Sequence, residues 1–427
     1  MRRKTVTILI MTLIMSIMAG CGKEEAPIEV EVVETPEVVE PEEWESLEIS
    51  TLMNTYYRQL AQLEKDVYKQ VLYEITNGNH VINICRGLDA KGVDNVVKSI
   101  EYDNPELFWI TGGYTFDGDT LTIETNKLAD DLEANKEKFN KAIEEIMEDV
   151  YFPYKADDFL KERLIHDKLL NSLEYDEDSE LGYTAYEALV NGKASCSGYS
   201  KAFQLLMQKS GVPCYYSVGR LYQGGTTTGH AWNAIRLGDN HYYVDVTLND
   251  TVLGKFGAIS YEFYNLNSED LKDSHNRNAM SLGLPAIDGT DLKYEEIYGE
   301  SCAEGAIKQL GLDKSYVVNN LDEFNKYVVN KLNANGLGEH TFKVIVSTDE
   351  LHSEIHYAIR IKIQEYLDAL NELNKKGWNK LSIETESYSL GDEHYLLEVS
   401  TNLEYVEPPK EEVNEESNNN SSGVGGW

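Results

Sequence analysis

The sequence predicts an α+β fold in which a central module lies between two smaller α+β modules. Three observations predict this arrangement. Segments with apolar residues at helical spacing alternate with short segments rich in β-branched and aromatic residues. Turn-forming pairs such as Asp117-Gly118 separate neighbouring strand-like segments, which favours antiparallel hairpins. The chain has 427 residues, 41% of them hydrophobic, which is enough for more than one core.

The N-terminal end has the features of a signal peptide over residues 1–20. Basic residues at 2–4 precede an apolar stretch at 5–19, which is shorter than the ~20 residues of a membrane-spanning helix. The sequence Met18-Ala19-Gly20-Cys21 resembles the lipobox of bacterial lipoproteins, in which the cysteine becomes the lipidated first residue. We therefore expect a lipid on Cys21 and attachment to the extracytoplasmic face of a bacterial cell membrane. The alternative is an ordinary signal peptide cleaved elsewhere, with Cys21 left as a free thiol.

Two further segments are expected to lie outside the folded modules. Residues 21–48 are acidic and contain Pro27, Pro36 and Pro41, which favours an extended tether over a stable strand. Residues 405–427 are rich in Pro, Glu, Asn, Ser and Gly, and this composition predicts a disordered tail.

The charge balance excludes one class of partner. Acidic residues outnumber basic residues 74 to 38, for a formal net charge of −36. Such a surface repels phosphate backbones, so we expect no nucleic-acid partner. Five cysteines are too few for a disulfide scaffold, and Cys85 and Cys302 could pair only if the flanking modules met. We expect no cofactor and no bound metal.

The two flanking modules, residues 49–150 and 301–404, are expected to follow one order of elements. The first is expected to contain a helix at 51–73, a strand at 80–85, a helix at 93–100, strands at 107–114 and 120–124, and a helix at 128–150. The second is expected to contain a helix at 320–332, a strand at 341–347, a helix at 350–375, and strands at 381–390 and 395–401. The shared α-β-α-β-β order indicates either two related modules or a chance similarity.

The central module, residues 151–300, carries the candidate chemistry. Helices are expected at 156–173 and 196–210, and Gly211 is placed to end the second. Strands are expected at 214–222, 230–237 and 241–247, with a hairpin turn at Gly238-Asp239-Asn240 between the last two.

Three residues of this module form a candidate catalytic set. Cys196 lies at the start of a helix, where unpaired N–H groups and the helix dipole stabilise a thiolate. Counting outward from the turn near Gly238 places His230 opposite roughly Asp245 to Thr247, with Asp245 and Thr247 on one face. Taken singly, Cys196 could be a small core residue and His230 a structural one. A nucleophile, a base and an orienting carboxylate in this order are more specific.

These residues lie in a stretch, from about His166 to Tyr298, that resembles the transglutaminase-like superfamily. The resemblance is carried by the segments 166–167, 188–193, 196–203, 211–214, 229–233, 243–247, 264–266 and 284–285. It implies a papain-like architecture in which a helix bearing Cys196 packs on an antiparallel sheet bearing His230 and Asp245.

The resemblance also implies acyl transfer through a thioester. His230 takes the Cys196 proton, Asp245 holds the imidazolium, and the thiolate attacks an amide of a protein or peptide at the cell envelope. The backbone N–H of Cys196 is a natural donor to the oxyanion. A second donor, or a wall of the cleft, could come from Tyr199, Tyr183 or Trp232. Water resolves the thioester in a peptidase or deamidase, and a lysine amine does so in a cross-linking enzyme; the sequence leaves both open.

The sequence also allows other interpretations. The module could instead be an envelope binding or assembly unit that retains the triad without using it, or a structural surface protein. His352 and His356 are spaced i, i+4, but they lack the glutamate of a zinc-protease motif, so we expect a solvated helix face. His166 is expected to be structural or to face the cleft, and Cys214 to be a buried hydrophobe.

Overall fold

A computed structural model describes residues 43–84, 87–150, 152–153, 155–250, 257–374, 377–391 and 393–406. The expected signal peptide, Cys21, Cys85 and most of the expected tether and tail lie outside these residues. The last residues of the expected tether belong to the folded body, because Glu43–Ser46 form the short helix η1 and Trp44 is buried. Within the described ranges, no helix is long and apolar enough to cross a membrane.

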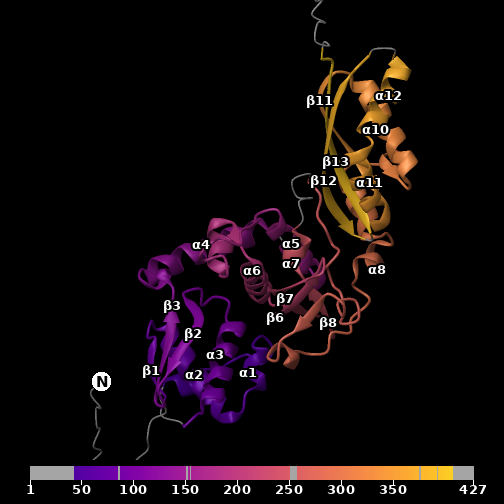
Figure 1. Ribbon diagram of the computed structural model, residues 1–427. Coiled ribbons are helices and arrows are strands. Elements are labelled where there is room, and N and C mark those ends of the chain that lie inside the picture. The colour runs from indigo at the N-terminus through magenta and orange to yellow at the C-terminus, as the bar shows by residue number, and fades with distance from the viewer. Residues whose placement is uncertain are drawn as a thin grey trace, which may run out of the picture. The chain divides into compact units, whose positions relative to one another are not determined.

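The first flanking module is a three-stranded antiparallel sheet with helices (Figure 1). Its elements are α1 (Thr55–Gln59), α2 (Gln62–Thr76), β1 (Val81–Asn83), α3 (Ala90–Asp103), β2 (Ile110–Phe116), β3 (Thr120–Thr125), η2 (Lys127–Ala129) and α4 (Leu132–Asp149). The single helix expected at 51–73 is two helices, because Leu60 and Ala61 are extended. The Asp103 carboxylate accepts the backbone N–H groups of Tyr56 and Tyr57, at 3.1 and 2.7 Å, and so fixes the start of α1 separately from α2.

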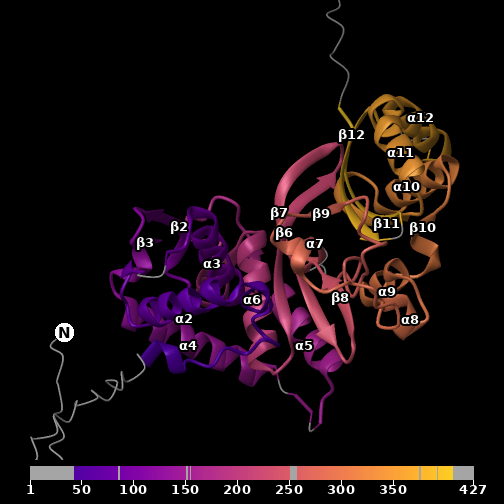
Figure 2. The same ribbon diagram turned by 90° about the horizontal axis from the view of Figure 1, so that it is seen from below.

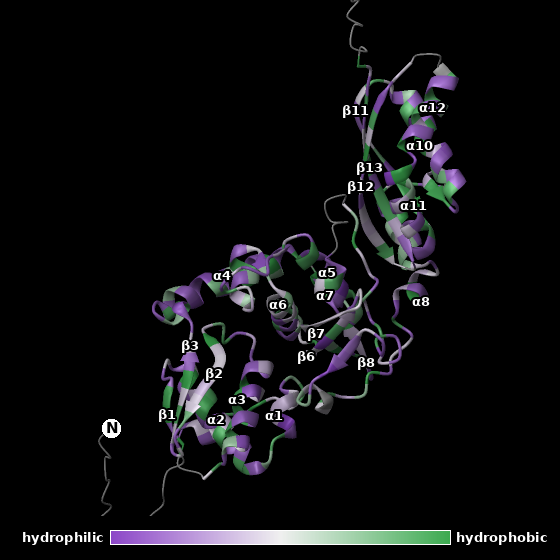
Figure 3. Ribbon diagram, in the orientation of Figure 1, coloured by the Kyte–Doolittle hydropathy of each residue, from purple (hydrophilic) through white to green (hydrophobic). Residues whose placement is uncertain are grey.

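The second flanking module is a four-stranded sheet with helices α10, α11 and α12 beside it (Figure 1). Its elements are η6 (Lys314–Tyr316), β10 (Val317–Val318), α10 (Leu321–Asn335), β11 (Gly338–Val346), α11 (Asp349–Ile361), α12 (Ile363–Asn374), β12 (Lys380–Gly391) and β13 (His394–Glu404). The helix expected at 350–375 is divided at Lys362. Strands β11, β12 and β13 carry both hydrophobic and hydrophilic residues (Figure 3), and their apolar side chains pack with the helices in one core.

The two flanking modules share a topology as well as an order of elements. The strand order is β1-β3-β2 in the first, and β11-β13-β12 within the second. In each, the last two strands form an antiparallel hairpin and the first strand pairs antiparallel with the last. The second module differs by adding β10, which pairs parallel with β11. The similarity predicted from element order thus extends to strand pairing.

The central module is built on an antiparallel sheet of order β8-β7-β6-β9, with α6 beside β6 and β7 (Figure 2). Its elements are α5 (Asp158–Leu170), β4 (Glu174–Tyr175), the π-helix η3 (Glu187–Asn191), β5 (Lys193–Ala194), α6 (Cys196–Lys209), β6 (Cys214–Gln223), β7 (Thr226–Leu237), β8 (Asn240–Val244), α7 (Val246–Asn249), β9 (His275–Arg277), η5 (Ser281–Gly283) and α8 (Tyr294–Tyr298). The helix α9 (Cys302–Gln309) follows, and its residues Ala303 and Ala306 share a core with strands of the second flanking module. The mixed helix and strand content confirms the predicted α+β class.

One expected strand of the central module is shorter than predicted. The strand expected at 241–247 ends at Val244, and the four-residue helix α7 follows. Asp245 is the N-cap of α7, because its Oδ1 accepts the backbone N–H of Leu248 at 3.0 Å. Thr247 therefore lies in a helix and does not share a strand face with Asp245.

The first flanking module and the helix α6 are joined by buried polar contacts. The Lys201 ammonium on α6 lies 3.1 Å from the Glu101 carboxylate on α3. The Gln204 amide on α6 donates to the backbone carbonyl of Tyr102 at 2.9 Å. Apolar residues of both modules also share one continuous core. The first flanking module therefore supports the helix that begins at Cys196.

The core of the central module contains the carboxyl group of Glu162 on α5. Its side chain is fully buried and accepts a hydrogen bond from the Asn265 amide at 3.0 Å. Burial raises the pKa of Glu162 from 4.5 to about 8, against the opposing effect of that hydrogen bond. Between these pH values the folded protein holds a proton that the unfolded chain has lost, so the free energy of unfolding falls as the pH rises.

Glu162→Gln is expected to weaken this pH dependence, because glutamine does not titrate. Between pH 5 and pH 8, the unfolding free energy of the wild type should fall by at least about 1 kcal/mol more than that of the variant. Urea denaturation at the two pH values measures this, with Glu177→Gln, at an exposed glutamate, as the matched control. Equal pH dependence in wild type and Glu162→Gln would contradict the assignment.

Candidate active site

Cys196 is the first residue of α6, and its side chain is partly exposed. The N-cap residue Ser195 does not cap the helix with its side chain, and its hydroxyl donates to the Gly182 carbonyl at 3.2 Å instead. The first N–H groups of a helix have no intrahelical acceptor, and they carry the positive end of the helix dipole. The sulfur therefore lies where a thiolate is stabilised.

The backbone around Cys196 is tightly packed. The Gly182 carbonyl accepts the backbone N–H of Ser195 at 2.9 Å, which ties the segment before α6 to the start of the helix. A Cβ atom on Gly198 would lie 2.2 Å from the Gly182 oxygen and 2.9 Å from the Ala194 Cβ. Only glycine at 198 allows this approach, so the position of Cys196 depends on it.

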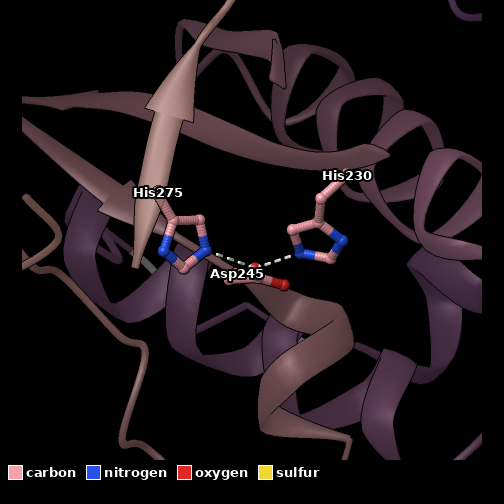
Figure 4. Close-up of side chains that lie close together, drawn as sticks. All are labelled: His230, Asp245 and His275. Atoms are coloured by element: carbon pink, nitrogen blue, oxygen red, sulfur yellow. Dashed lines mark hydrogen bonds and ion pairs between the residues drawn. The ribbon is translucent and has the colours of Figure 1, made fainter. Parts of the chain in front are cut away.

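His230 and Asp245 meet inside the central module. His230 lies on β7, and its Nε2 is 2.5 Å from Oδ2 of Asp245. The pairing of Asn233 with Val244 between β7 and β8 brings Asp245, the next residue, beside the His230 strand. Both side chains are buried. The second ring nitrogen of His230 points away from Asp245 (Figure 4), which leaves it free of the carboxylate.

A second histidine contacts the same carboxylate oxygen. His275 on β9 places its Nε2 3.0 Å from Oδ2 of Asp245, and Figure 4 shows the carboxylate between the two imidazole rings. β9 reaches this position by pairing antiparallel with β6, with His275 opposite Leu221. Sequence reasoning missed His275. A three-residue strand leaves no pattern in the sequence, and the neighbours of His275 carry no motif.

The charges in this group are mutually stabilised. Burial alone would lower the pKa of His230, but the Asp245 carboxylate and a hydrogen bond with Cys196 outweigh it and raise the pKa to about 10. Burial opposes ionisation of Asp245, yet His230 and His275 hold its pKa below the ordinary value. An imidazolium beside Cys196 and an ionised Asp245 are therefore the favoured forms near neutral pH.

The aromatic residues predicted for the cleft occupy different places. Trp232 is fully buried and lies parallel to the His230 ring, with the ring centroids 6.0 Å apart. The Tyr199 hydroxyl donates a hydrogen bond to the Asp250 carboxylate. The Tyr183 hydroxyl accepts from the Asn126 amide at 2.9 Å. In this conformation Trp232 covers the histidine, and the two tyrosine hydroxyls are engaged elsewhere.

Two tyrosines that the sequence did not single out lie near the nucleophile. The Tyr216 hydroxyl is 2.9 Å from Oγ of Ser197, the residue after Cys196. Burial raises the pKa of both Tyr175 and Tyr216, with a further rise from Cys196 for Tyr175 and from Glu101 and then Cys196 for Tyr216. Tyr175 is exposed, whereas Tyr216 is buried.

The remaining candidates are placed as follows. His166 is fully buried and accepts from the Asn249 amide of α7 at 3.1 Å, so it supports the helix that Asp245 caps. Cys214 is a buried free thiol, and burial raises its pKa. Cys302 is buried as well, and its thiol donates to the Tyr261 carbonyl at 3.4 Å. His352 stacks on Tyr395, with ring centroids 4.1 Å apart.

The described residues contain one group of three side chains with metal-ligating atoms close together, namely His230, Asp245 and His275. The two imidazole nitrogens lie at hydrogen-bond distances from the one carboxylate oxygen. His352 and His356 are not part of such a group within the same residues.

Comparison with known proteins identifies a family for part of the central module. Residues 150–246 match the model of the transglutaminase-like superfamily, and the chain therefore contains a transglutaminase-like domain. This confirms the resemblance seen in the sequence. A structure described as "Crystal structure of a TGase" aligns with 20% identity and a TM-score of 0.22, over 32% of this chain and 43% of that chain. A search of curated proteins finds no match.

The crowding at Gly198 predicts a loss of stability in Gly198→Ala. The added methyl group must displace backbone at the start of α6, which should cost about 1–3 kcal/mol of unfolding free energy. Gly229→Ala is the control, because a Cβ there meets no atom within 4 Å. Thermal denaturation of both variants measures the difference. Equal stability of Gly198→Ala and the wild type would show that α6 does not depend on the close contact between Gly198 and the Gly182 carbonyl.

Proposed function

We propose that the protein is a cysteine acyltransferase or hydrolase that forms a thioester with an amide carbonyl of a protein or peptide. The observation that carries the proposal is the meeting of three groups at one place. A partly exposed cysteine lies at a helix start, an imidazole interacts with it, and a buried carboxylate holds the other side of that imidazole. The transglutaminase-like match over residues 150–246 supports the same chemistry.

The first half of the reaction joins the substrate to the sulfur. The Cys196 thiolate attacks the amide carbon, and a C–S bond forms as the carbonyl becomes an oxyanion. The backbone N–H of Cys196 is free of an intrahelical acceptor and can donate to this oxyanion. The C–N bond then breaks, and the His230 imidazolium gives its proton to the departing amine.

The second half of the reaction restores the enzyme. Water or a primary amine attacks the thioester carbon, and His230 accepts the proton of the attacking group. The C–S bond breaks, and the products are the thiolate and either a carboxylic acid or a new amide. Asp245 remains ionised throughout and keeps the imidazole oriented.

The proposed place of action is the outer face of a bacterial cell membrane, with a lipid on Cys21. The basic, apolar and small-residue segments at 1–20 support this placement. The acidic segment that follows Cys21 would hold the folded body away from the membrane, and the substrates would be proteins or peptides of the cell envelope.

Cys196→Ala is expected to abolish acyl transfer, because it removes the sulfur that forms the thioester. Activity toward a glutamine-bearing protein, with a fluorescent primary amine or water as acceptor, should fall at least about 10³-fold. Cys214→Ala, at the buried thiol, is the matched control and should stay active. Substantial turnover by a folded Cys196→Ala variant would refute the nucleophile assignment.

Cys21→Ala is expected to prevent lipidation. Bacteria that express the wild type in the presence of radiolabelled palmitate should label the protein, and cells expressing the variant should not. The labelled wild type should sediment with membranes, whereas a smaller fraction of the variant, which lacks the lipid, should do so. Label that persists in Cys21→Ala would contradict the proposed anchor.

A further inference from the structure

His275 lies in contact with the proposed catalytic machinery but is not used by it. Its side chain is buried, and its Nε2 is 3.0 Å from the same Oδ2 atom of Asp245 that His230 contacts at 2.5 Å. The remaining Asp245 oxygen, Oδ1, accepts the backbone N–H of Leu248 at 3.0 Å. Asp245 is thus fixed by donors from β7, β9 and α7.

The hydrogen-bond partners of His275 define its tautomer. A carboxylate oxygen only accepts hydrogen bonds, so Nε2 of His275 carries the proton in that contact. In the neutral imidazole Nδ1 is then the acceptor, and the Ser274 hydroxyl, 2.8 Å away, donates to it. The Trp232 ring lies edge-on to the His275 ring and packs against it, with ring centroids 4.9 Å apart.

We propose that His275 is a positioning residue, which shares Oδ2 of Asp245 with His230 and so limits how tightly the carboxylate holds the His230 proton. This inference deepens the proposed function, in which His230 must give that proton to a leaving amine. An oxygen that accepts two N–H groups offers less charge to each. The Nε2–H dipole of His275 also points its positive end toward the imidazolium of His230, which destabilises the charged form.

The charged groups that raise the pKa of His230 are Asp245 and Cys196. Asp245 contacts Nε2 of His230, and Cys196 on α6 forms a hydrogen bond with the same imidazole. On β6 the residue opposite His230 is Gly219, and Arg220 pairs with Gly229 and so points to the other face of the sheet.

Arg277 on β9 is on the same sheet face, but its guanidinium lies over the Tyr243 ring, 5.8 Å from the centroid. The contact that links His275 to His230 is the shared Oδ2 atom of Asp245.

The same side chains could in principle hold a metal ion, but their distances fit hydrogen bonds better. A tetrahedral zinc ion at ~2.0 Å from each ligand would keep nitrogen and oxygen ligands about 3.3 Å apart. The observed separations are 2.5 and 3.0 Å, and both share one oxygen.

The test is an NMR titration, from pH 6 to pH 12, of the full-length chain labelled at histidine Cε1. His275→Leu removes the donor while filling a similar volume, and the midpoint of His230 should rise by about 0.5–1 pH unit. His275→Gln places an amide N–H near the same oxygen and should return the midpoint close to the wild-type value. Ser274→Ala, which frees Nδ1 to take the proton, should give a smaller rise and serves if His275→Leu fails to fold.

The outcomes separate the explanations. An unchanged midpoint in His275→Leu overturns the proposal, as does an equal rise in His275→Leu and His275→Gln, which would assign the effect to ring packing. A wild-type titration that changes with EDTA would reveal a bound metal and also overturn it. The titration needs no substrate, so it reports on His275 even if Cys196 proves not to transfer acyl groups.

Discussion

The buried contact between His230 and Asp245 is the interaction on which the rest of the site depends. An ionised carboxylate away from water is costly unless charge and hydrogen bonds compensate it, and breaking such a pair typically costs about 3–5 kcal/mol. Here the compensation comes from the His230 imidazole on β7, from His275 on β9 and from the first turn of α7. The sheet order β8-β7-β6-β9 brings these elements together. Helix α6 then needs only to present Cys196 to the free side of the imidazole.

Much of this arrangement could be predicted from the sequence because its signals are local. The helix that starts at Cys196 and the hairpin that carries His230 follow from apolar periodicity and from a turn at Gly238. The expected position of Asp245 beside the histidine strand followed from counting residues across that turn. His275 could not be predicted, because its place is set by the long-range pairing of β9 with β6. The early end of β8 was missed for a related reason, since a four-residue helix has too few residues to show a period.

The flanking modules show a second limit of local patterns. Their common α-β-α-β-β order was visible in the sequence, and the strand pairing of the structure extends it to a shared topology. The division of the first expected helix at Leu60 was not visible, because the carboxylate that fixes α1 belongs to Asp103, far along the chain. The contact between Glu101 and Lys201 makes the first module part of the support of α6. The helix that begins at Cys196 is thus supported by residues from outside the transglutaminase-like match at 150–246.

The most direct test of the account is the rate of alkylation of Cys196 by iodoacetamide as a function of pH, read by mass spectrometry beside Cys214. The account predicts rapid reaction of Cys196 at pH 6, well below the ~8.5 at which an ordinary thiol ionises. It also predicts that His230→Ala loses this rapid reaction and that Cys214 stays unreactive, since burial raises its pKa. A Cys196 that is accessible but alkylates like an ordinary thiol would contradict the claim that the helix start, His230 and Asp245 form an activated nucleophile.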